Sequence, residues 1–169
     1  MQLNLEKLDL KHASELFGAL NHEKIGLFIG GPDVTTLTEL ENRIQHLQKG
    51  PSEETGQRWF NFAVLLESVV IGRVEATAHT GIVEIAYLIN PSLWGQGLGT
   101  AATGLLLSEL RREGEHNFWA TTVPENLGSA KVLEHLGFTE IDPTLAPDLL
   151  SFDEGDRVFN LIDQTPDHH

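Results

Sequence analysis

A glycine-rich segment in the second half of the chain has the residue types that bind a phosphate. It consists of Trp94, Gly95, Gln96, Gly97, Leu98, Gly99, Thr100 and Ala101, between a strand-like apolar run and a run with helical periodicity. Glycine lets backbone N–H groups approach anionic oxygens closely, and the unpaired N–H groups of a helix start carry partial positive charge. The segment therefore predicts a phosphate or pyrophosphate site, although glycines that only turn the chain would give the same pattern.

Two nucleotide-binding motifs compete for this segment. Residues 97–102 satisfy the dinucleotide pattern G-x-G-x-x-[GA], but that turn normally opens a parallel β-α-β unit with an acidic residue about 20 positions later. Here the preceding strands form a meander, and Thr121 and Thr122 occupy the next strand. No Gly-Lys-Ser/Thr follows, so a Walker loop is absent. A dinucleotide-binding enzyme is the weaker alternative.

Hydrophobic periodicity predicts the elements that position this segment. Strand patterns cover residues 3–7, 59–66, 69–77, 82–89, 118–123, 138–141 and 157–162. Helical patterns cover residues 13–20, a run capped at Thr36 that ends at Gly50, residues 98–112, and a run from Asn126 to Gly137. Residues 25–32 have the glycine and proline of a loop. The order predicts a mixed sheet with helices on both faces.

Two blocks resemble the GNAT superfamily of N-acetyltransferases. The Trp94–Ala101 segment resembles its acetyl-CoA pyrophosphate loop, [QR]-x-x-G-x-[GA], with Trp94 in the first position, as in the RimJ/RimL-like branch of ribosomal-protein alanine N-acetyltransferases. The Asn126–Phe138 segment resembles that branch's N-x-x-S-x-x-(apolar)₂-E-x-L-G-F block. Weaker similarity extends over residues 2–162 and is strongest over 81–138.

The resemblance implies the GNAT fold, an α/β arrangement with helices on both faces of a mixed, mostly antiparallel sheet that splays between its fourth and fifth strands. Residues 1–163 are expected to form one N-acetyltransferase domain, followed by a disordered tail at 164–169 whose two histidines could be a tag remnant. Acetyl-CoA is the implied co-substrate, lying between strands 82–89 and 118–123. Its implied contacts are the backbone of Leu88 and Ile89, residues 94–100, Asn126 and Ser129.

Transfer of an acetyl group to an amine needs a base for the amine and a donor for the leaving thiolate. Glu84 is the expected base, because it interrupts an apolar strand and burial would raise the pKa of its carboxyl group; it could instead face solvent, and Glu75 is the reserve. By resemblance, Ser129 lies near the CoA sulfur. Many GNAT enzymes have a tyrosine where this chain has Leu133, and the only tyrosine here is Tyr87.

Composition limits the partners and the compartment. The chain has 25 acidic and 11 basic residues, a net charge of -14, which disfavours nucleic acid and suits a cationic partner. It has no cysteine, no pattern of metal ligands, and no apolar run long enough for a signal peptide or a membrane span, so a cytoplasmic protein is expected.

The acceptor is therefore expected to be a primary amine, such as the N-terminus of a basic ribosomal protein. A small-molecule amine (a polyamine, aminoglycoside or metabolite) and a catalytically silent acyl-CoA-binding or regulatory module are the alternatives.

Overall fold

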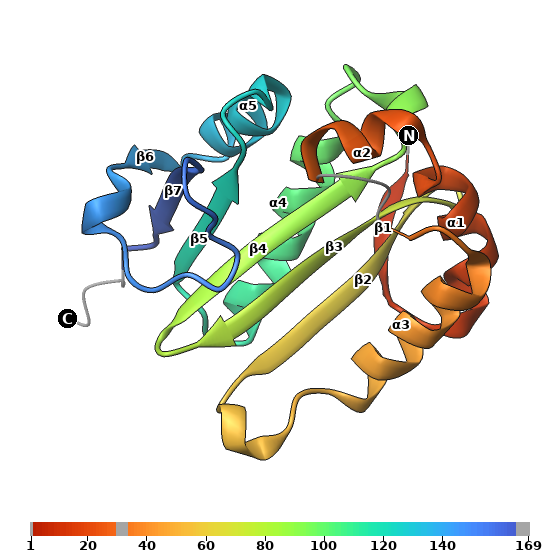
Figure 1. Ribbon diagram of the computed structural model, residues 1–169, viewed down its shortest axis with the longest axis horizontal. Coiled ribbons are helices and arrows are strands. Elements are labelled where there is room, and N and C mark those ends of the chain that lie inside the picture. Colours follow the sequence, from red (N-terminus) through yellow and green to blue (C-terminus); the bar gives the residue numbers. More distant parts are fainter. Residues whose placement is uncertain (1, 30–33, 165–169) are drawn as a thin grey trace.

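The computed structural model describes residues 2–29 and 34–164, which build a seven-stranded sheet with helices on both faces (Figure 1). The strands are β1 (Leu3–Lys7), β2 (Arg58–Leu66), β3 (Val69–His79), β4 (Ile82–Ile89), β5 (Asn117–Thr122), β6 (Thr139–Ile141) and β7 (Arg157–Ile162). The helices are α1 (Ala13–Leu20), α2 (Glu23–Ile29), α3 (Leu37–Lys49), α4 (Leu98–Arg112) and α5 (Leu127–His135). The strand order is β1-β2-β3-β4-β5-β7-β6, and only β4 and β5 are parallel neighbours.

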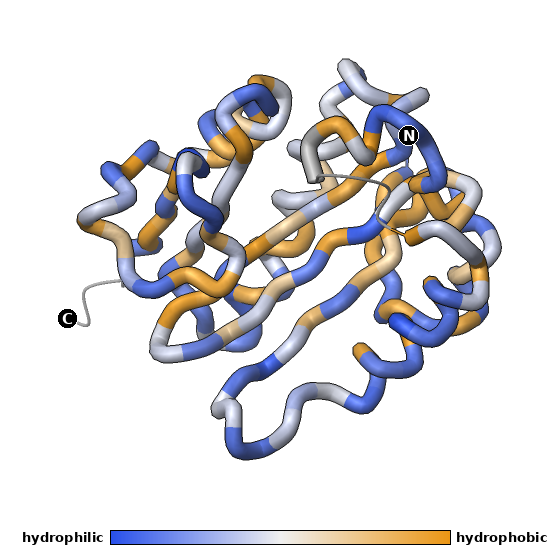
Figure 2. Tube along the Cα trace, in the orientation of Figure 1, coloured by the Kyte–Doolittle hydropathy of each residue, from blue (hydrophilic) through white to orange (hydrophobic). Residues whose placement is uncertain are grey.

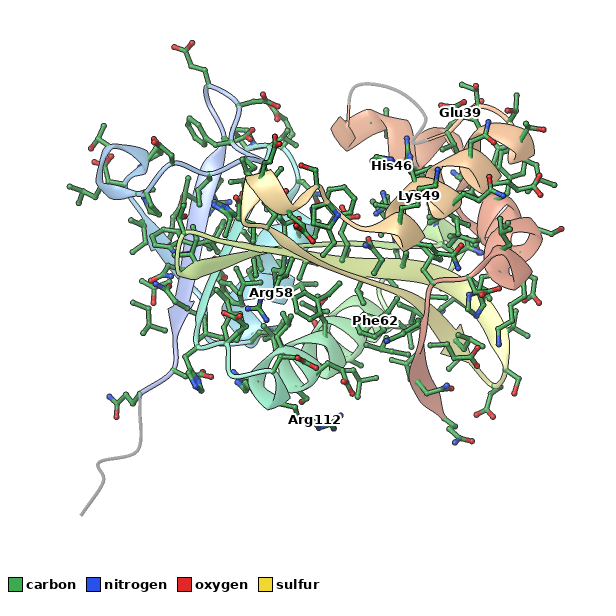
Figure 3. The ribbon with its side chains drawn as sticks, turned by 90° about the horizontal axis from the view of Figure 1, so that it is seen from below. Glu39, His46, Lys49, Arg58, Phe62 and Arg112 are labelled. Carbon is green, nitrogen blue, oxygen red and sulfur yellow. The ribbon has the colours of Figure 1, made fainter. Side chains whose placement is uncertain are left out.

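Side-chain alternation along the strands divides the interior into two main cores. On β2, Val64 faces the core under α4, whereas Ala63 and Leu65 face the core under α1 and α3. Figure 3 shows the sheet nearly edge-on, with His46 and Lys49 of α3 on one side and Arg112 of α4 on the other. In Figure 2, hydrophobic segments of the strands lie beneath the helices, and hydrophobic and hydrophilic residues alternate along α3, which covers one face of the sheet.

The parallel pairing between β4 and β5 is short. Only two residue pairs match, Val83 with Phe118 and Glu84 with Trp119, near the start of both strands. Beyond them the two strands separate, as Figure 1 shows, while β4 stays paired with β3 as far as Ile89. The expected splay between the fourth and fifth strands is confirmed, and it opens the sheet in front of the start of α4.

Local capping signals fix the helices next to this opening. Helix α4 begins and ends at the predicted residues. The Asn126 side chain accepts a hydrogen bond from Ser129 N at 3.0 Å, and Gly137, just beyond α5, has a φ of +94°. The Thr36 side chain likewise accepts from Glu39 N at the start of α3. These predictions from sequence are confirmed.

One expected loop is wrong in part. Residues 23–29 form α2, whereas the sequence pattern predicted a loop over 25–32. The helix start is held by the backbone bond from Ile25 N to His22 O and by the bond from Lys24 N to the His22 ring, and Ile25 is 2% exposed in the core. Burial of this one side chain favours a helical turn that local propensity does not predict.

Some expectations fall on residues outside the described part of the chain. They are the glycine-proline turn at 30–32 and, except for Gln164, the expected disordered tail. Within residues 2–29 and 34–164, no helix is long and apolar enough to cross a membrane.

Candidate acetyl-CoA and amine site

A cavity of about 1130 Å³ lies where β4 and β5 diverge, with the start of α4 and the start of α5 in its walls. All the residues predicted from sequence to form the site line this cavity except Gln96 and Glu84; they are Leu88, Ile89, Trp94, Gly95, Gly97, Leu98, Gly99, Thr100, Asn126 and Ser129. The tertiary structure therefore brings together segments that are more than 30 residues apart in sequence.

The glycine-rich segment adopts the backbone needed for an anion site. Gly95 and Gly97 have φ values of +82° and +77°, and Gly97 is the N-cap of α4. The first hydrogen bond of the helix runs from Ala101 N to Gly97 O, so the N–H groups of residues 98–100 have no partner within the helix. These three N–H groups, which the helix leaves without an internal partner, and the helix dipole favour a phosphate or pyrophosphate.

The end of β4 is tied to this loop by Trp94. Its indole N–H donates to the Ile89 carbonyl oxygen at 2.9 Å, so this carbonyl is already used by the protein. The Leu88 carbonyl faces β3, where a Cβ added to Gly72 would lie 2.2 Å from it. The pairing of pantetheine with the backbone of Leu88 and Ile89 stays a prediction, and neither of these two carbonyls supports it.

Ser129 is the polar residue of α5 that faces β4. Its hydroxyl lies 2.6 Å from the Tyr87 hydroxyl, and the Tyr87 hydroxyl also lies 3.0 Å from the Ser129 carbonyl oxygen. Burial raises the pKa of Tyr87 to about 12, partly offset by the hydrogen bond from Ser129. Leu133, at the position of the absent helix tyrosine, is fully buried in the core.

Glu84 is buried, as its apolar strand predicts, but its environment differs from the expected one. Leu150 N and His79 Nε2 contact Oε2 at 2.8 and 2.5 Å, whereas Ser151 N and Oγ contact Oε1 at 3.0 and 2.7 Å. Burial by itself raises the pKa of Glu84, but the hydrogen bonds from Ser151, Leu150 and His79 together outweigh it, so the pKa is lowered. The expected rise in this pKa is therefore wrong.

Glu84 instead holds the segment between β6 and β7. Residues 150 and 151 of this segment come 66 and 67 positions after Glu84, and Figure 1 shows the segment running beside β5. Ser151, Asp153 and Asp156 of the same segment line the cavity. No local sequence signal identified these residues as part of the site, because a loop between two strands has no periodicity that places it.

Glu75, the reserve candidate, does line the cavity. Its side chain is 37% exposed, and its Oε2 lies 2.8 Å from Nη1 of Arg73 on the same strand. The cavity walls also include two nitrogen-bearing side chains of α5, those of Lys131 and His135. Within residues 2–29 and 34–164 no group of three or more His, Cys, Asp or Glu residues is placed to hold a metal ion.

Comparison with known proteins identifies the family. Residues 2–139 match the family described as acetyltransferase (GNAT) domain. A search of curated protein sequences gives no match. The ribosomal-protein N-acetyltransferase RimL, solved with coenzyme A, is 20% identical, with 96% of this chain and 94% of that chain covered and a TM-score of 0.78. Mycobacterium smegmatis RimJ, in complex with CoA-disulfide, is 19% identical (95% and 81% covered, TM-score 0.76). An aminoglycoside acetyltransferase in complex with coenzyme A is 17% identical (95% of both chains, TM-score 0.74).

The family match also argues against the alternative that the glycine-rich segment is a dinucleotide site. The strands before the glycine-rich segment form a meander, but β4, α4 and β5 also form a parallel β-α-β unit, which the sequence pattern did not predict. However, the two strands separate after two residue pairs, and β5 ends in Thr121 and Thr122 rather than in an acidic residue. With a matching family over most of its length and a splayed sheet that places a glycine-rich helix start in a cavity, the chain belongs to the GNAT acetyltransferase family and is an N-acetyltransferase.

Proposed function

We propose that this protein transfers the acetyl group of acetyl-CoA directly to a primary amine within the cavity between β4 and β5. The observation that carries the proposal is that one cavity has both an anion-binding helix start and carboxylates in its walls. The presence of coenzyme A in the RimL and aminoglycoside acetyltransferase structures, which share this fold, supports the same co-substrate here.

The cofactor end of the cavity is the start of α4. The unpaired N–H groups of residues 98–100 would hold the pyrophosphate, and Gly95 and Gly97 would let it approach the backbone. Lys131 and His135 follow each other by one helical turn on α5 and would lie beside the phosphates of CoA. Asn126 would act mainly by capping α5, which fixes Ser129.

The amine end of the cavity carries the carboxylates Glu75, Asp153 and Asp156. An ammonium group is attracted there, but it must lose a proton before it can attack the thioester. We assign this proton transfer to Glu75, because it lines the cavity, whereas Glu84 is outside its lining and already contacts four groups of the protein. Glu84 as catalytic base stays a prediction, which this geometry favours less.

The reaction then has few steps. Glu75 takes the ammonium proton directly or through water and releases it to solvent. The neutral amine nitrogen then attacks the thioester carbonyl carbon, its second proton passes to Glu75, and the carbon–sulfur bond breaks. Ser129 donates a hydrogen bond to the departing thiolate, which takes up a proton from water. An α-amino group has a pKa near 8, against about 10.4 for a lysine side chain, so it loses its proton more readily. Together with the charge of -14, this favours the N-terminus of a basic protein as acceptor.

Two assays in sequence test the proposal. Thermal unfolding is followed with acetyl-CoA and with NADPH, because a ligand at 100 times its Kd stabilises the folded state by about 2.7 kcal/mol. Stabilisation by acetyl-CoA alone is expected. Release of CoA thiol is then measured with a basic peptide with a free N-terminus, the same peptide N-acetylated but containing lysine, and a polyamine.

The free peptide is expected to react fastest. Preference for the polyamine would replace the protein acceptor with a small amine, and absence of thiol release with every amine would refute the proposed reaction. Glu75→Gln should lower kcat by about 100-fold or more, as loss of a general base does. Glu54→Gln, on an exposed turn away from the cavity, is the matched control and should leave kcat unchanged.

A further inference from the structure

Tyr87 and Ser129 form a hydrogen-bonded pair that spans the opening of the sheet. Tyr87 lies on β4 and Ser129 in the first turn of α5, 42 residues later, and both line the cavity. The Tyr87 hydroxyl has two partners, the Ser129 hydroxyl at 2.6 Å and the Ser129 carbonyl oxygen at 3.0 Å. A tyrosine packed on a strand is common in a protein core. Here, however, both hydrogen-bond contacts of the phenol are to Ser129, the candidate donor to the thiolate, which suggests a role in catalysis beyond packing.

The two contacts have different consequences for the serine. A phenol has one proton to donate, and so does a serine hydroxyl. If Tyr87 donates to the Ser129 carbonyl, then the serine proton is used on the phenol oxygen. If Tyr87 donates to the serine oxygen, the serine proton is available to another acceptor. Both arrangements are within reach without moving either side chain, because only the two hydrogen atoms rotate.

We propose that Tyr87 is a positioning residue for acetyl transfer: its hydroxyl donates to Ser129 Oγ and so directs the Ser129 O–H at the leaving sulfur of CoA. This inference rests on the proposed function, in which Ser129 donates a hydrogen bond to the thiolate. As negative charge develops on sulfur, the serine O–H turns toward it and the tyrosine proton moves its hydrogen bond from the carbonyl to the serine oxygen. No covalent bond to Tyr87 forms or breaks.

The high pKa of Tyr87 agrees with a role in orienting the Ser129 hydroxyl and not with donation of a proton to the leaving thiolate. Burial raises the pKa of Tyr87 to about 12, well above the value of about 8.5 for a thiol. The phenol therefore remains protonated during turnover and is a permanent donor. A partly buried hydroxyl on β4 thus performs part of the task for which the chain lacks a tyrosine on α5, where Leu133 is buried instead.

A double-mutant cycle tests this pair. Tyr87→Phe removes only the hydroxyl, and Ser129→Ala removes its partner. We expect Tyr87→Phe to lower kcat by about 10-fold and Ser129→Ala by about 10-fold or more, with the Kd for acetyl-CoA within twofold of the wild type. The double variant should be no slower than Ser129→Ala, because Tyr87 acts through Ser129. Ser108→Ala, which removes an exposed hydroxyl bonded to Gly104 of its own helix, is the control and should retain wild-type kcat.

Several results would overturn the inference. If kcat of Tyr87→Phe equals that of the wild type, or if the two effects multiply in the double variant, Tyr87 does not act through Ser129. Failure of the proposed function is distinguishable, because then the wild-type protein itself releases no thiol with any amine.

A spectroscopic measurement covers the case in which a variant folds poorly. The chain has one tyrosine, so the ultraviolet band of tyrosinate reports Tyr87 alone. In the wild type this band should appear only near pH 12, and saturation with desulfo-CoA, which lacks the sulfur, should shift it less than CoA does. Titration of Tyr87 near the ordinary pKa of 10, or equal shifts of the band with CoA and desulfo-CoA, would refute the proposed coupling of Tyr87 to the sulfur through Ser129.

Discussion

Replacing Glu84 with glutamine should weaken the attachment of the segment between β6 and β7 by a predictable amount. Each carboxylate oxygen accepts one backbone N–H, from Leu150 on Oε2 and from Ser151 on Oε1. A glutamine amide has only one oxygen, so in either orientation its NH₂ group faces a backbone N–H. The His79 ring and the Ser151 hydroxyl can reverse their roles and accept a hydrogen bond, but a backbone N–H cannot. Glu84→Gln therefore leaves one amide unpaired in both orientations.

One unpaired, partly buried amide costs about 1–3 kcal/mol, and the bonds that remain lose their charge assistance. We therefore expect the free energy of unfolding in urea to fall by about 2 kcal/mol at neutral pH. Glu140→Gln is the control, because Glu140 is an exposed carboxylate that pairs with Arg157 at 2.8 and 2.9 Å. Exposed pairs of this kind contribute about 1 kcal/mol or less.

The difference in unfolding free energy between the wild type and Glu84→Gln should depend on pH with a definite sign. The pKa of Glu84 is lowered in the folded protein, so its contribution is present above the unfolded value near 4.3 and is lost as the pH falls through the folded value. The wild type and Glu84→Gln should therefore differ most at neutral pH and converge in acid. The same variant should raise KM for the amine and leave the Kd for acetyl-CoA unchanged, since Ser151 lines the cavity.

Two outcomes would contradict the role assigned to Glu84. Equal stability of Glu84→Gln and Glu140→Gln would show that the contacts at Glu84 do not hold the segment. Unchanged stability combined with a collapse of kcat and loss of the acid limb of the pH–rate profile would identify Glu84 as the base, as its place in the sequence suggested.

Three further predictions concern the sheet, the loop and the partly buried phenol of Tyr87. Gly72→Ala should destabilise the fold by about 3 kcal/mol, because the new Cβ would lie 2.2 Å from the Leu88 carbonyl oxygen; a loss below 1 kcal/mol in urea would contradict this close approach. Gly97→Val should abolish binding of acetyl-CoA in calorimetry and cost about 1–2 kcal/mol of stability, because φ is +77° there; intact affinity would remove the loop from the site. The wild type should lose roughly 2–3 kcal/mol of stability between about pH 10 and 12, where only unfolded Tyr87 ionises, and a Tyr87→Phe protein that shows the same loss would contradict the raised pKa.

Features governed by short stretches of chain were predictable from sequence. The cap at Asn126, the bounds of α4 and the strand pattern of the central hairpins depend on residues within one or two turns or on simple alternation. The glycine-rich segment is also local, because backbone freedom at Gly95 and Gly97 is a property of those residues alone. The resemblance of two short blocks was then sufficient to indicate the family.

The tertiary structure decided which partners the polar side chains have. An apolar strand correctly predicted burial of Glu84 but not the four donors that reverse the direction of its pKa shift, because three of them come from residues 150 and 151. Likewise, Tyr87 reaches Ser129 only because β4 and β5 diverge beside α5. Burial can be inferred from the pattern of neighbours along the chain, whereas a hydrogen-bond partner far along the chain is set by how the whole sheet folds.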